Sequence, residues 1–260
     1  MSDEQTKITA NIMDYMSYLL GLIERRDWLK FSQVALSSPK SYKFICEIID
    51  RCAEFHGMTL LHAVARYDPP VDLVKSMIEL YPSALRSEDC LGRTPLHVAA
   101  GSDASPWVIK LLVCSFPGAC SLQDEDGRTA LHFVCDTSCE LFEDDVPRER
   151  RPPGLDVVKV LLAGSLDSVT LEDRDEMNAV EYAICSGASM DVVNLLQKAT
   201  QRVMKKSAKL SEAKMAAHNA LETQVLYSRY QGYLPFKCRR RGMPSTARDV
   251  DGDSASSLIT

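Results

Sequence analysis

The feature that most constrains the fold is a segment that recurs at a fixed distance along the chain. Three short stretches begin at Gly57, Gly92 and Gly127, and each starts 35 residues after the one before. A fourth, less regular copy begins at Glu176, which places about 14 additional residues inside the third unit. Fixed repeats of this length are typical of solenoid proteins, in which each unit buries its apolar surface against its neighbours. The chain is therefore predicted to be a row of stacked units.

Each repeat carries the signals of two short helices. Thr59, Thr94 and Thr129 stand where a hydroxyl group caps a helix N-terminus, and Pro95 fits the first helical position. The glycine that precedes each threonine suits a turn with positive φ. A second helix is indicated by apolar residues at helical spacing, which recur in the four units as Leu73-Val74 with Met77-Ile78, Val108-Ile109 with Leu111-Leu112, Val157-Val158 with Leu161-Leu162, and Val192-Val193 with Leu195-Leu196.

The stretch Gly92–Ala100 reads G-R-T-P-L-H-V-A-A and resembles the signature of the ankyrin-repeat family. The stretches that begin at Gly57 and Gly127 resemble it closely, whereas the one at Glu176 lacks the glycine, the threonine and the histidine. The resemblance covers roughly residues 27–200. It implies an all-α ankyrin-repeat solenoid of helix-turn-helix units, with a helical N-terminal cap and a long C-terminal helix.

The resemblance and the local sequence predict four regions. Apolar residues at helical spacing between Ile8 and Ile23 indicate a helix that covers the first unit, and terminal units are expected to be atypical. The predicted regions are a capping helix (1–26), a repeat domain (27–200), a helical extension (201–231) and a basic tail (232–260) expected to be disordered. The repeat domain comprises a divergent unit 27–56 and units 57–91, 92–126, 127–175 with an inserted, mobile loop 136–153, and 176–200.

Candidate chemistry centres on three histidines, His62, His97 and His132. The resemblance implies that they are structural and form hydrogen bonds to the backbone near the turn. A metal site of His132 with Cys135 and Cys139 is conceivable but disfavoured, because a fourth ligand is not evident. No cofactor is expected.

Acidic pairs at Glu125-Asp126 and Glu172-Asp173 are the other candidates for acid–base chemistry. Because they recur at the turns between units, a solvated turn is the favoured interpretation. No nucleotide-binding loop or hydrolase motif is present in the sequence. We therefore expect a protein that is not an enzyme and has no catalytic residue.

The resemblance implies that a partner protein binds to the turns and to the inner helices that line the concave face, in the manner of a scaffold or adaptor. Phe55 and Tyr67 are aromatic candidates, with packing against a neighbouring unit as the alternative. The full set of candidate partner-binding residues is Phe55, His56, Met58, Arg66, Tyr67, Leu91, Arg93, Ser102, Asp103, Glu125, Asp126, Arg128 and Asp136.

Net charge and cysteine usage indicate the cellular compartment and the kind of partner. The net charge is −6, and a basic excess lies toward the C-terminus, where Lys237, Arg239, Arg240 and Arg241 form a cluster. This cluster is a candidate nucleic-acid or chromatin contact in a nuclear regulator, the alternative function, or else a solvating tail. Nine cysteines at irregular spacings, with no signal peptide or membrane span in the sequence, favour a reduced cytoplasmic or nuclear setting. A monomer is expected, without contact with a membrane.

Overall fold

The computed structural model describes residues 3–52, 55–138, 141 and 152–231. The described residues contain eleven α-helices and no β-strand, and three 3-10 turns lie between them. The chain divides into two compact units, Met1–Lys209 and Leu210–Thr260. The predicted all-α repeat architecture is confirmed. The C-terminal tail, with its cluster at Lys237 to Arg241, and most of the insertion 136–153 lie outside the described residues.

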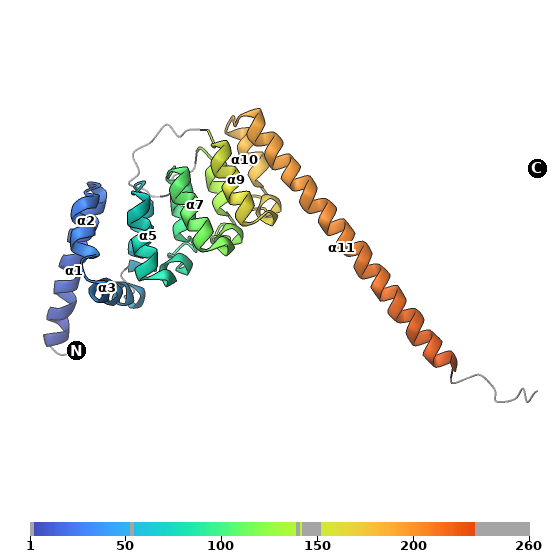
Figure 1. The fold of residues 1–260 in the computed structure, drawn as a ribbon, viewed down its shortest axis with the longest axis horizontal. Coiled ribbons are helices and arrows are strands. Elements are labelled where there is room, and N and C mark those ends of the chain that lie inside the picture. The colour runs from blue at the N-terminus through green and yellow to red at the C-terminus, as the bar shows by residue number, and fades with distance from the viewer. Residues whose placement is uncertain (1–2, 53–54, 139–140, 142–151, 232–260) are drawn as a thin grey trace, which may run out of the picture. The chain divides into compact units, whose positions relative to one another are not determined.

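The repeats form two rows of helices in the first compact unit (Figure 1). The inner row contains α4 (Leu60–Ala65), α6 (Pro95–Gly101), α8 (Ala130–Cys135) and α10 (Ala179–Cys185). The outer row contains α5 (Val71–Leu80), α7 (Pro106–Ser115), α9 (Leu155–Gly164) and the start of α11 (Met190–Gln231). Every residue of α4 and α6 is buried, because other helices cover these short helices on more than one side.

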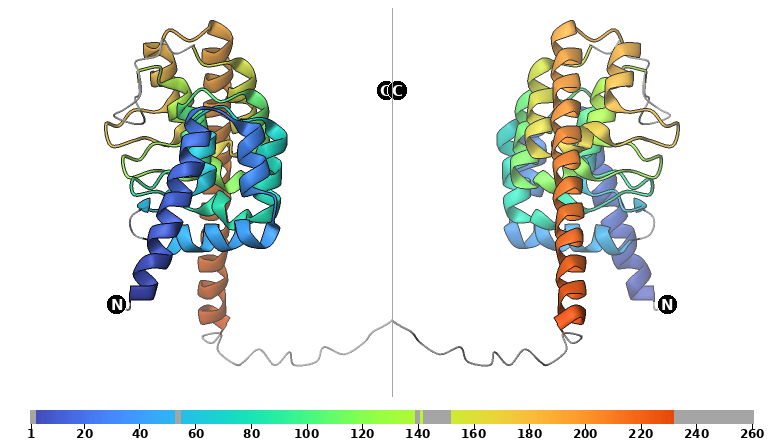
Figure 2. Two further views of the ribbon diagram at one scale, coloured as in Figure 1. Left: turned by 90° about the vertical axis from the view of Figure 1, so that its left-hand side faces the viewer. Right: turned by 90° about the vertical axis from the view of Figure 1, so that its right-hand side faces the viewer.

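The connections between units follow a repeated path. The outer helices α5, α7 and α9 each lead into a 3-10 turn, at η2 (Pro82–Arg86), η3 (Pro117–Ser121) and η4 (Asp167–Thr170). The chain then runs out and back as a loop before the next inner helix, and we call each of these loops a finger. Figure 2 shows the fingers stacked along one edge of the helices. The described fingers are residues 87–93, 122–128 and 171–177.

The N-terminal part differs from the repeats. Helix α1 (Asp3–Glu24) packs against α2 (Trp28–Ala35), and buries Leu19, Leu22 and Ile23. Helix α3 (Pro39–Arg51) contacts α5 but runs crosswise to it, as Figures 1 and 2 show. Residues 28–51 therefore form a helix pair with a different geometry from the units that follow.

The long helix α11 changes character along its length. Val192, Leu196 and Ala199 are buried and complete the last unit. Beyond them Met204, Leu210 and Met215 are exposed by more than half of their surface. The sequence predicts a helical extension over 201–231, and the described residues form one continuous helix from Met190 to Gln231.

Candidate interaction surface

One aspartate, which is buried at Asp89 and Asp173 and half-buried at Asp124, organises each described finger. Asp89 accepts hydrogen bonds from the backbone N–H groups of Leu91 and Arg93 through Oδ1, at 3.0 and 2.9 Å. Asp124 accepts in the same way at 3.0 and 2.7 Å, and Asp173 at 3.0 Å from two N–H groups. The aspartate stands three residues before the position of the repeat glycine in each unit. Its side chain therefore fixes the conformation of the turn that forms the finger tip.

Neighbouring fingers are joined by backbone hydrogen bonds. The N–H of Glu125 donates to the carbonyl of Leu91 at 2.9 Å, and the N–H of Arg174 donates to the carbonyl of Asp126 at 2.8 Å. Close approach explains the glycine at Gly127, where φ is +80° and an added Cβ would lie 3.0 Å from Cα of Asp173. The three finger tips are consequently held at a fixed spacing.

The repeat histidines connect each helix start to the next finger. In each of the first three units the N-cap threonine N–H donates to histidine Nδ1, at 3.1 Å for His62 and 3.0 Å for His97 and His132. Since Nδ1 accepts, the ring proton lies on Nε2. Nε2 of His62 then donates to the carbonyl of Arg93 at 2.9 Å, and Nε2 of His97 to the carbonyl of Leu122 at 3.1 Å. The structural role implied by the resemblance is confirmed for these two rings.

The third histidine differs in one contact. Nε2 of His132 is buried and makes no hydrogen bond of ordinary geometry with the part of the chain that the structure describes. Burial lowers the pKa of all three histidines, to about 4 for His62 and His97. These rings are neutral at pH 7, and they therefore serve as hydrogen-bonding groups and not as charges.

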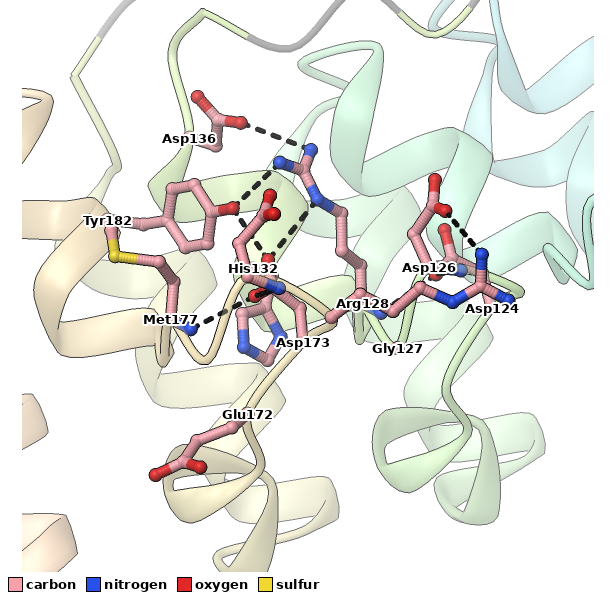
Figure 3. A network of polar contacts seen from close by, with 12 residues as sticks. Asp124, Asp126, Gly127, Arg128, His132, Asp136, Glu172, Asp173, Met177 and Tyr182 are labelled. Carbon is pink, nitrogen blue, oxygen red and sulfur yellow. Dashed lines mark hydrogen bonds and ion pairs between the residues drawn. The ribbon is translucent and has the colours of Figure 1, made fainter.

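Arg128 is the centre of a polar network, which Figure 3 shows. Its guanidinium donates to Asp136 Oδ2 at 3.2 Å and to the Tyr182 hydroxyl at 2.7 Å, and Nε lies 3.6 Å from Asp173 Oδ2. The Tyr182 hydroxyl donates to Asp173 at 2.6 Å. Hydrogen bonds from Tyr182 and from finger N–H groups lower the pKa of Asp173 despite the opposing effect of burial. The network links the finger 122–128, the end of α8, the finger 171–177 and α10.

Arg93 occupies the corresponding position one unit earlier but has different partners. Its Nε and Nη2 atoms each lie 2.8 Å from Oδ2 of Asp89 in the same finger. Its Nη1 donates to the backbone carbonyl of Leu141 at 2.7 Å. The side chains of Arg93 and Asp89 are exposed by only 7% and 1%, so this ion pair lies inside the repeat stack.

The fourth unit keeps the turn and the cap with other residues. Glu176 adopts φ +59° where the earlier units have glycine. Asn178 caps α10 by accepting from the N–H groups of Val180 and Glu181, and its own N–H donates to Glu181 Oε2 at 2.8 Å. The carboxylate of Glu181 thus takes the place of histidine Nδ1 as the acceptor, although the fourth unit lacks the threonine and histidine of the repeat motif.

The structure places the predicted partner-binding residues in three groups. His56, Leu91, Asp103, Glu125 and Asp126 are exposed. Half-buried positions are held by Phe55, Met58, Arg66, Tyr67, Ser102 and Arg128. Arg93 and Asp136 are buried, at 6% and 4% exposure, in the ion pairs described above.

Among the half-buried residues, Phe55 and Tyr67 pack against the hydrophobic core. The guanidinium of Arg66 lies over the Tyr67 ring, 5.4 Å from its centroid. This geometry agrees with the packing alternative for both aromatic residues, although the exposed part of Tyr67 and Arg66 still lies at the end of α4.

The interpretation of the acidic pairs as solvated turns holds for Glu125, Asp126 and Glu172, which are exposed, and is wrong for Asp173. The side chain of Asp173 is buried because it accepts hydrogen bonds from its own finger and from Tyr182. Sequence reasoning missed the turn-forming role of Asp89, Asp124 and Asp173, and it also missed Leu141. The recurrence of aspartate three residues before the repeat glycine position was the signal for the first three; none existed for Leu141.

Within the described residues no group of three or more His, Cys, Asp and Glu side chains is placed to hold a metal ion. Cys139, one member of the disfavoured metal site, lies outside them, and Nδ1 of His132 accepts a hydrogen bond from the N–H of Thr129. The described helices also include none with the length and apolar character needed to cross a membrane.

Comparison with known proteins agrees with the geometry. A family model described as ankyrin repeats (many copies) matches residues 77–134, which run from the end of α5 through the second unit and into α8. No curated protein sequence matches the chain. The fingers, the paired helices and the matched segment together support an ankyrin-repeat protein. Repeats of this family generally mediate contacts between proteins, and the family is typically non-enzymatic.

Proposed function

We propose that this protein is a non-catalytic binding module that holds a partner protein along its row of fingers. The observation that supports this most directly is the pair of backbone hydrogen bonds between fingers, in which the N–H of Glu125 donates to the carbonyl of Leu91 and the N–H of Arg174 to the carbonyl of Asp126. These bonds hold exposed side chains of separate units in one fixed row. A surface that is ordered before binding loses less conformational entropy when a partner is bound.

The charge of the fingers indicates the chemistry of the partner. Glu88, Glu125, Asp126, Asp175 and Glu176 are exposed in the three described fingers. The exposed cation Arg174 pairs with Asp126 at 3.3 Å. Leu91, exposed by 45%, adds an apolar contact beside these acids. We therefore expect a partner with a basic segment that also carries an apolar residue.

The alternative of a nucleic-acid contact depends on Lys237, Arg239, Arg240 and Arg241, which lie outside the described residues. An acidic finger row repels a phosphate backbone. The proposal therefore keeps a protein partner for the fingers. Removal of residues 232–260 tests the alternative separately, since a loss of salt-sensitive DNA binding on truncation would support a role of the tail in nucleic-acid binding.

The test is affinity capture followed by measurement of binding with the purified partner. The finger variant Glu125→Lys/Asp126→Lys reverses two exposed charges in one finger. The control Glu79→Lys/Asp156→Lys makes the same charge change on the outer helices, at carboxylates whose side chains are 65% and 82% exposed. We expect the finger variant to weaken binding at least tenfold and the control to bind as wild type does.

Circular dichroism must first show the same helical content for both variants. A partner that binds the finger variant and the wild type equally would contradict the proposed surface. In the same assay, alanine at Arg66 and Tyr67 shows whether the surface extends to the end of α4.

A further inference from the structure

The residue at the C-terminal end of the inner helix, as its last residue or its C-cap, distinguishes the second unit from its neighbours. Arg66, Gly101 and Asp136 stand 35 residues apart at corresponding positions. Asp136 reaches the guanidinium of Arg128 in its own unit. Gly101 has no side chain and leaves a notch at the end of α6. An added Cβ there would lie 2.5 Å from Cδ1 and 2.8 Å from Cγ of Leu141, so the leucine side chain fills the notch.

Leu141 enters this notch from the insertion in the third unit, and only 6% of its surface is exposed. Its backbone carbonyl accepts the hydrogen bond from Arg93 Nη1 at 2.7 Å. In the third unit the corresponding guanidinium nitrogen bonds to the carboxylate of Asp136. Because Gly101 supplies no carboxylate, the acceptor for Nη1 of Arg93 in the second unit comes from a peptide segment outside that unit, whereas Nε and Nη2 pair with Asp89 inside it.

We propose that Arg93 and Gly101 form a docking site for a leucine-bearing peptide segment, and that the protein's own Leu141 occupies this site. Arg93 is already oriented by Asp89, so the site presents a fixed donor beside an apolar notch. Binding of a partner segment at this site rests on the proposed function, because a partner segment of the same chemistry would have to displace Leu141. A segment of the same chain has a high effective concentration and therefore outcompetes a weak external peptide.

The occupancy of the notch is tested by a double-mutant cycle with Gly101→Ala and Leu141→Ala in the full-length protein. Alanine is a better helix former than glycine, so Gly101→Ala alone should raise the melting temperature wherever the notch is empty. In wild type, the methyl group that Gly101→Ala adds displaces the side chain of Leu141. We expect Gly101→Ala to lower the melting temperature by a few degrees in wild type and to raise it in the Leu141→Ala background. The same change in both backgrounds would overturn the docking of Leu141.

The docking site itself is tested with a peptide of the sequence of residues 137–147, with serine in place of Cys139. Chemical shifts of Gly101 and of the Arg93 Nε–H group report binding to the Leu141→Ala protein. We expect saturation with a Kd of about 1 mM, at least tenfold weaker binding to wild type, and none for the peptide with alanine in place of Leu141.

Absence of binding to Leu141→Ala, or equal binding to both proteins, would show that Leu141 only fastens the insertion and would overturn the docking site. Neither Gly101 nor Leu141 is altered in the finger variants. A failure of this inference is therefore distinguishable from a failure of the proposed finger surface.

Discussion

The first three repeat units and the fourth unit solve the same local problem with different residues. In the first three, a histidine caps the inner helix through Nδ1 and, in His62 and His97, also donates to the next finger through Nε2. In the fourth unit Glu181 performs only the capping role. A carboxylate has no proton to donate at neutral pH, and no further finger follows α10 in the described chain. The comparison separates a local requirement for a cap from a requirement imposed by the neighbouring unit.

The largest effect that sharpens this comparison is the dependence of stability on pH. The pKa of His62 and His97 is about 4 in the folded protein and about 6.5 in the unfolded chain, so the unfolded chain binds more protons between these values. Their contribution is present above pH 6.5 and is lost as the pH falls toward 4. Between pH 7 and 5 we expect the free energy of unfolding to fall by about 2 kcal/mol for each histidine. Urea unfolding at both pH values measures it.

A control for the pH effect is the His62→Gln/His97→Gln protein, in which the slope of unfolding free energy against pH should be smaller. An unfolding free energy that is constant between pH 7 and 5 in wild type would show that the buried rings titrate normally.

The next effect compares one substitution in two units. His97→Ala removes the cap and the inter-unit hydrogen bond, and leaves the half-buried carbonyl of Leu122 without its donor; we expect a loss of about 3 kcal/mol in unfolding free energy. Glu181→Ala removes an exposed cap alone and should cost about 1 kcal/mol. Urea denaturation followed by circular dichroism measures both. Equal losses would show that the bond to the next finger contributes nothing.

The smallest effect concerns the turn. Glu176→Gly relieves a non-glycine residue at φ +59°, and we expect a gain of about 0.5 kcal/mol after the greater entropy of glycine in the unfolded chain is subtracted. At the corresponding position of the third unit, Gly127→Ala should lower the free energy of unfolding by more than about 1 kcal/mol, because φ is +80° and the backbone of Asp173 is close. Melting temperatures at neutral pH provide the measurement. A loss on Glu176→Gly would contradict the assignment of strain to this turn.

Much of the fold was predictable from local patterns. The caps at Thr59, Thr94 and Thr129, the proline at the start of α6 and the apolar faces of the outer helices are each specified within one unit. The same reasoning failed for Asp173, because a polar residue at a turn is usually solvated, whereas this carboxylate is enclosed by its own finger and by Tyr182, nine residues later. It placed Arg93 among the partner-binding residues, whereas the structure buries this side chain against Asp89 and against the carbonyl of Leu141, which lies 48 residues away.

The sequence by itself determined the repeat, its length and its helices, because hydrogen bonds and apolar spacing within about 35 residues are sufficient to define a unit. The tertiary structure decided which polar side chains are buried, how the fingers are joined, and that α3 crosses the row of helices. Those outcomes depend on contacts between units, and a contact between units leaves no periodic signal in the sequence of either one. The notch at Gly101 is the plainest case, since its occupant comes from the least regular segment of the chain.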